Sequence, residues 1–212
     1  KDAHAGETTA AGNTITISRA GTESEWFDWN GSAWVPRFGI HAALTLFSDR
    51  YAYANSNGVS EVYYDPDGSD SAHGRLDTRT TPSGEVLNCI YDISTGVIEQ
   101  CNRSTPDVVE RYRYVFDGEF LSSVTLERNP AGSDWFPVRR AVYTYYPDND
   151  DYGSEGDLKT AEVQNPSATS SSSGSTSGSL SSETAWTTEG TSYYRYYKDD
   201  SSAPGFEHAL KF

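Results

Sequence analysis

The chain has 212 residues, and its 16 basic and 31 acidic side chains leave a net charge of −15 at pH 7. A charge of this sign repels nucleic-acid phosphates and anionic lipid headgroups, so neither nucleic-acid binding nor membrane insertion is expected. With 15 Tyr, 5 Trp and 8 Phe residues, the chain has enough large rings to build a core. A composition rich in Tyr and Gly favours strands over helices.

Short alternating or aromatic-rich runs, broken by Gly, Pro, Asn or Asp, predict an all-β fold. The clearest predicted strands cover residues 14–17, 42–47, 111–116, 123–127 and 140–146. A further hairpin is predicted from strands 26–29 and 33–38, because Asn30-Gly31 between them can take the positive φ angles of a two-residue turn.

Residues 167–182, SATSSSSGSTSGSLSS, are nearly all Ser, Thr and Gly. Such a segment gains too little from burial to offset the entropy of ordering it, so it predicts a flexible insertion. It is read either as a glycosylated stalk or spacer, or as an enlarged β-turn, and the second reading is favoured. Because a strand pattern resumes at 191–197, the insertion is expected to separate two strands of one sheet.

A loose unit recurs along the chain: an aromatic residue, an Asp, a turn with Gly, and an apolar residue that opens the next strand. The Asp positions are 25 to 31 residues apart, an interval typical of repeat architectures. Each unit predicts a β-hairpin whose Asp accepts hydrogen bonds from backbone N–H groups. Hairpins added edge to edge form a long twisted sheet or an open spiral strip. The residues of the unit are Tyr64, Asp65, Gly74, Arg75 and Leu76, then Tyr91, Asp92 and Gly96, then Phe116 and Asp117, and finally Asp148, Gly156 and Leu158.

These units resemble the repeats of the Rhs/YD family, named for the Tyr-Asp dipeptide, and in particular its large secreted bacterial members. Tyr64-Asp65 with Gly74-Arg75-Leu76 is the best match, and Tyr91-Asp92 is the second literal one. The resemblance covers about 45–212, and residues 1–44 are expected to form an amino-terminal cap. It implies a strip of antiparallel hairpins without catalysis of its own, since activity in that family usually resides in a separate domain.

The chain starts with Lys1 and contains no Met, so it is interpreted as a mature or excised piece of a longer precursor. Together with the resemblance, this predicts an extracellular or cell-surface location. The expected partners are copies of the same chain or the rest of a longer parent chain.

Cys89 and Cys101 lie equally far from Thr95, at the centre of the predicted Ser94-Thr95-Gly96 turn. Residues equidistant from a hairpin turn face each other across the strands, close enough for a disulfide. A disulfide is therefore predicted, and a pair of small buried thiols is the alternative.

Two acidic turns suggest calcium, and the second begins like an EF-hand loop. Lys159 stands where that loop needs a bidentate Glu, so only a weak calcium site is considered, and ordinary Asx turns are the favoured reading. The site would use Asp148, Asp150, Asp151 and Glu155.

No HExxH or Gly-x-Ser-x-Gly motif is present, and the four His residues are scattered, so an enzyme is not expected. Exposed tryptophans suggest a rival function, a platform for stacking on sugar rings. The favoured reading is that these side chains pair across strands. The tryptophans in question are Trp26, Trp29, Trp34 and Trp135.

The sequence thus predicts a non-catalytic structural protein that assembles through its sheet edges into a filament or a larger shell. A carbohydrate-binding or adhesive cell-surface module is the alternative. No cofactor other than calcium is indicated.

Overall fold

The computed structural model describes residues 14–19, 23–130, 134–148, 150–167, 184–197 and 208–210. Within these ranges the chain forms 14 strands, and strands that follow one another in the chain are neighbours in the sheet. The described residues form no helix of the length and apolarity needed to cross a membrane. The prediction of an all-β strip of successive antiparallel hairpins is confirmed.

The chain divides into two compact units, Lys1–Arg111 and Tyr112–Phe212, and the expected cap boundary at residue 44 lies inside the first. The first unit holds β1 (Thr14–Arg19), β2 (Glu23–Trp29), β3 (Trp34–Pro36), β4 (Ala42–Phe47), β5 (Arg50–Asn55), β6 (Ser60–Tyr64), β7 (Leu76–Thr80), β8 (Val86–Tyr91) and β9 (Ile98–Ser104). The second holds most of β10 (Val109–Asp117), with β11 (Phe120–Asn129), β12 (Phe136–Tyr145), β13 (Leu158–Pro166) and β14 (Trp186–Tyr193).

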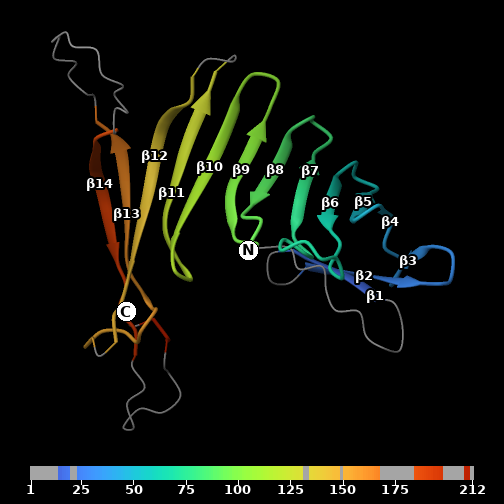
Figure 1. Cartoon of the computed structure of the whole chain (residues 1–212), viewed down its shortest axis with the longest axis horizontal. Coiled ribbons are helices and arrows are strands. Elements are labelled where there is room, and N and C mark those ends of the chain that lie inside the picture. The colour runs from blue at the N-terminus through green and yellow to red at the C-terminus, as the bar shows by residue number, and fades with distance from the viewer. Residues whose placement is uncertain are drawn as a thin grey trace. The chain divides into compact units, whose positions relative to one another are not determined.

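The first unit has a core built largely from aromatic rings. Figure 1 shows β1 and β2 running across the neighbouring strands of this unit, and the Phe27 ring meets the Tyr53 ring edge-on at 6.2 Å. Burial of such rings supplies the apolar area that the few aliphatic side chains cannot. The buried cluster consists of Ile15, Ile17, Phe27, Leu44, Tyr51, Tyr53 and Tyr63.

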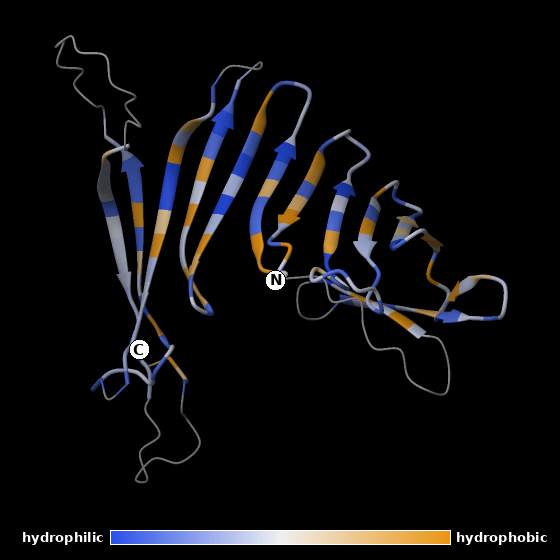
Figure 2. Ribbon diagram, in the orientation of Figure 1, coloured by the Kyte–Doolittle hydropathy of each residue, from blue (hydrophilic) through white to orange (hydrophobic). Residues whose placement is uncertain are grey.

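The second unit is built differently, as a sheet whose side chains are mostly half-buried. Among its described large hydrophobic residues only Tyr146 is buried. Figure 2 shows hydrophobic and hydrophilic residues alternating along its strands. Because successive side chains point to opposite faces, one face is more apolar and the other polar. The apolar face carries the aligned Val124, Ala141 and Val163, and the polar face carries the aligned Thr125, Arg140, Gln164 and Thr188.

The hairpin predicted around Asn30-Gly31 forms, but its turn is wider than the expected two residues. The strand ladder ends with Trp29 opposite Trp34, so four residues connect β2 and β3. Only Gly31 has a positive φ, and Asn30 closes the loop instead, since its Oδ1 accepts hydrogen bonds from the Ser32 and Ala33 N–H groups. The Asn30 N–H also donates to Ala33 O at 3.1 Å, so a backbone hydrogen bond and a side-chain cap close the loop together.

The strands on either side of the Ser-rich segment belong to one sheet, as predicted. β13 and β14 pair antiparallel from Pro166 opposite Trp186 to Thr160 opposite Tyr193. β14 starts at Trp186, earlier than the predicted 191, because the Thr-rich stretch before it also fits a strand. Apart from Ser167, the insertion at 167–182 lies outside the described residues.

Candidate functional site

Three hairpins share one turn geometry, which is the structural counterpart of the repeat. At the first, Tyr64 N–H donates to Arg75 O at 2.9 Å and Gly74 N–H donates to Tyr64 O at 3.2 Å. In the second unit, Tyr146 N–H donates to Asp157 O at 2.8 Å and Gly156 N–H donates to Tyr146 O at 3.1 Å. The two turns are therefore closed by the same pair of backbone hydrogen bonds, which we call the turn frame.

The third turn repeats the frame with a shorter loop. Asp92 N–H donates to Val97 O at 2.8 Å, and Gly96 N–H donates to Asp92 O at 2.9 Å. In all three turns a register shift precedes a Tyr that faces an apolar residue, and the turn Gly has a positive φ, which costs a glycine little. The facing pairs are Tyr63 with Leu76, Tyr91 with Ile98, and Tyr145 with Leu158.

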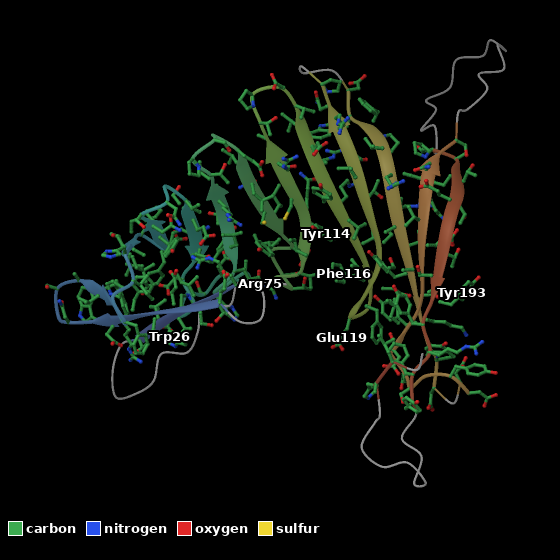
Figure 3. All side chains as sticks on the ribbon, turned by 180° about the vertical axis from the view of Figure 1, so that it is seen from behind. Trp26, Arg75, Tyr114, Phe116, Glu119 and Tyr193 are labelled. Carbon is green, nitrogen blue, oxygen red and sulfur yellow. The ribbon has the colours of Figure 1, made fainter. Side chains whose placement is uncertain are left out.

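The two literal Tyr-Asp dipeptides occupy positions in the turn frame that differ by one residue. Tyr91 occupies the position of Tyr63 and not that of Tyr64, and Asp92 occupies the position of Tyr64. The sequence pattern therefore locates the turns without giving their register. Phe116-Asp117 leads into a shorter kind of turn. Asp117 is the last residue of β10, and only Gly118 and Glu119 connect it to β11 (Figure 3).

The Asp92 carboxylate caps its turn, as the repeat predicts for its Asp. Asp92 Oδ1 accepts hydrogen bonds from the Ser94 N–H and Oγ–H at 3.0 and 2.6 Å and from the Thr95 N–H and Oγ1–H at 2.7 and 2.8 Å. These hydrogen bonds, first those of the Ser94 and Thr95 hydroxyls, hold the pKa of Asp92 well below its usual range. Asp65 plays a smaller part, accepting from the Asp67 N–H at 3.0 Å.

The longer turn loops also contact the next hairpin along the chain. Ser71 Oγ donates to the carbonyls of Asp92 and Ile93 at 3.2 and 2.8 Å, and the Arg75 guanidinium lies 5.6 Å from the centre of the Tyr91 ring (Figure 3). In the second unit the Tyr146 hydroxyl donates to Tyr194 O at 2.7 Å. Neighbouring hairpins are thus joined at their turns as well as along their strands.

A buried carboxylate ties β1 to β6 in the first unit. Glu61 is only 3% exposed, and its Oε2 accepts from Arg19 Nε at 2.9 Å and from the Tyr63 hydroxyl at 2.7 Å. Burial, and then the charge of Glu61, raise the pKa of Tyr63. The sequence offered no signal for this network, because Arg19 and Glu61 are 42 residues apart and fit no motif.

Cys89 and Cys101 face each other in the predicted register. Both are buried, and their Sγ atoms lie 2.8 Å apart as free thiols, against a covalent S–S length of about 2.05 Å. The geometry therefore brings the pair together without a bond, and the disulfide stays a prediction.

The proposed calcium ligands lie in the loop between β12 and β13. One of them, Asp150, is engaged by protein groups, since its Oδ2 lies 3.1 Å from Lys159 Nζ and its Oδ1 accepts from the Tyr152 N–H at 3.0 Å. Among the described residues, which exclude Asn149, no group of three or more acidic, His or Cys side chains is arranged to hold a metal ion. Calcium binding by Asp148, Asp150, Asp151 and Glu155 remains a prediction, which a melting temperature measured with and without EDTA tests.

The four tryptophans do not form one platform. Trp29 and Trp34 face each other across a hairpin, with ring centres 5.5 Å apart, and Trp34 also packs against Tyr51. Trp26 points to the opposite face of β2, where its ring meets Phe38 edge-on, and Trp135 belongs to the other unit. The cross-strand packing predicted as the favoured reading is what Trp29 and Trp34 adopt.

No protein-family model matches the chain, and the search of curated proteins finds no match either. The likeness to Rhs/YD repeats thus rests on the residues of the repeat alone, and what it implies about function is a proposal.

Proposed function

We propose that this chain is a non-catalytic structural strip of YD-type hairpins from an extracellular protein. Its sheet is extended at β14 by a strand from another copy of the chain or from the rest of a longer parent chain. The observation that carries the proposal is the outer edge of β14: within the described residues this strand pairs only with β13.

The composition of β14 suits an edge that is meant to pair. Its sequence, WTTEGTSY, contains residues that favour strands and has neither Pro nor Lys, the residues that commonly block an edge. Every residue after Trp186 is exposed. Its single charge, Glu189, sits at a register shift and is paired with Arg139, so Thr191, Ser192 and Tyr193 form a regular uncharged run beyond it.

Net charge supplies an opposing force. Each added copy brings a charge of −15, and salt screens repulsion between exposed charges. Association is therefore expected to strengthen as salt rises, the reverse of what attraction between opposite charges gives.

The experiment is negative-stain imaging with sedimentation at low and physiological salt, for the unmodified chain, Thr191→Lys and Ile93→Lys. The control adds the same charge at a turn residue that is 92% exposed. Filaments or larger assemblies are expected for the unmodified chain and Ile93→Lys and not for Thr191→Lys. Separate particles of the unmodified chain at every salt concentration would overturn extension by copies and would leave extension by the rest of a longer parent chain or the binding-module alternative.

A further inference from the structure

A groove of about 750 Å³ lies on the polar face of the second unit and crosses its strands from β10 to β14. Aromatic and hydrogen-bonding side chains line it together. The lining residues that matter for binding are Arg113, Thr125, Glu127, Trp135, Arg140 and Trp186.

Arg140 is held in a fixed position in this groove. Its guanidinium lies 4.4 Å from the centre of the Trp186 ring, and its Nε and Nη2 donate to Gln164 Oε1 at 2.9 and 2.6 Å. A guanidinium stacked on an aromatic ring and bonded to a neutral amide is oriented while keeping its full positive charge. Since it has five N–H donors, others remain for a ligand.

The groove brings two arginines together on a strongly acidic chain. Arg113 and Arg140 line the groove with one carboxylate, Glu127, and the Arg113 Nη1 to Glu127 Oε1 distance is 3.9 Å, longer than a hydrogen bond. A second carboxylate, Glu162, accepts from Gln164 Nε2 on the same face and partly balances Arg140. Arg113 is 56% exposed, whereas Glu127 is 13% exposed. An exposed arginine and the spare donors of a second one favour an anionic group on the ligand.

The remaining chemistry narrows the class of ligand. A sugar ring has an apolar C–H face that packs on an indole and a rim of hydroxyls that pairs with side chains such as Thr125 and Glu127. An open groove across a sheet also admits a chain of such rings. We propose that this groove binds a saccharide that carries a carboxylate, a uronic-acid polymer. Arg140 and Arg113 bind its carboxylates, and Trp135 packs on a ring. This site is independent of the structural role proposed for β14.

The test is calorimetric titration with a trimer of galacturonic acid and, as the neutral comparison, a trimer of galactose. Arg140→Gln removes the charge but keeps an amide, and at least a tenfold loss of affinity for the acidic trimer is expected, since a charge-assisted pair is removed. Trp135→Phe keeps an aromatic ring and is expected to retain most of the affinity, whereas Trp135→Ala lowers it. The matched control is Trp29→Ala in the first unit, which should bind like the unmodified chain.

Rising salt should weaken binding of the acidic trimer, because the pairing is electrostatic. Equal affinity for both trimers, an undiminished affinity in Arg140→Gln, or no binding of the acidic trimer would each overturn the proposal. Circular dichroism of every variant separates a lost site from a lost fold.

Discussion

Ser71 lies directly over Gly96: its Oγ donates to the Ile93 carbonyl at 2.8 Å, and a Cβ at position 96 would collide with the Ser71 backbone. The loop before β7 is therefore fitted to the turn between β8 and β9. This contact joins one hairpin to the next in the first unit and explains why a glycine is required there beyond its positive φ.

Gly96→Ala is expected to destabilise the chain by about 2 kcal/mol or more, because it adds a steric clash to a strained backbone. Gly84→Ala is the matched control, since Gly84 also has a positive φ but nothing within 4 Å of its Cβ position. Its loss should be smaller, about 1 kcal/mol. Urea unfolding of both variants measures the difference, and equal losses would contradict the close fit of Ser71 over Gly96.

Glu61→Gln should cost about 3 kcal/mol, because it removes the buried carboxylate that pairs with Arg19 at 2.5 Å and leaves that guanidinium only the more distant Glu25, at 3.6 Å. The comparison is Asp28→Asn, which breaks an ion pair with Arg37 in which both side chains are more than 40% exposed. That pair is screened by solvent, so its loss should be much smaller. Chemical denaturation gives both values, and similar effects would show that the Glu61 network contributes little.

Cys89 and Cys101 are expected to form a disulfide when the protein is kept in an oxidising medium. The link would close a loop of 13 residues and contribute about 3 kcal/mol. Intact mass before and after reduction detects it. In the reduced protein, the neighbouring Cys101 and burial raise the pKa of Cys89, so the native thiols should react with iodoacetamide only slowly. Alkylation of both cysteines in unreduced protein, once urea has unfolded the chain and exposed them, would refute the disulfide.

Asp92 should make the stability of the fold depend on pH in the acid range. Its pKa in the folded chain is lowered by hydrogen bonds, so its stabilisation is present at neutral pH, above the unfolded pKa, and is lost as pH falls through the folded pKa. Asp92→Asn should therefore melt at a lower temperature at neutral pH, and the two melting curves should converge in strong acid. Asp28, whose pKa the Arg37 guanidinium lowers to about 2, titrates in the same acid range in both proteins. A constant difference at all pH values would show that the charge of Asp92 is not what caps the turn.

Local patterns predicted much of the fold. The strand 42–47 is β4 to the residue, and the symmetry of Cys89 and Cys101 about Thr95 is the observed register. These succeed because alternation and turn chemistry act between residues close in the chain. The one-residue offset between the Tyr64-Asp65 and Tyr91-Asp92 turns was not predicted, because strand register depends on the facing strand and not on the dipeptide.

Long-range partners were not predictable in the same way. Trp186 carries no motif, yet it lies under Arg140, which is 46 positions earlier in the chain and on a different strand. The groove exists only because β13, which pairs with both β12 and β14, brings the two side chains to one face. The tryptophans chosen from the sequence were those of an evident hairpin, and three of the four pack within the first unit.

The central claim is that the β14 edge is where the sheet is extended, and hydrogen–deuterium exchange at increasing protein concentration tests it most directly. The Tyr194 N–H donates to Lys159 O at 3.0 Å, and N–H groups alternate in direction along a strand, so the N–H groups of Thr191 and Tyr193 point away from β13. These two amides should become more protected as concentration rises, while those of the exposed Ile93 turn stay unchanged. Exchange in β14 that is fast and independent of concentration, under conditions where larger assemblies are seen, would contradict the account.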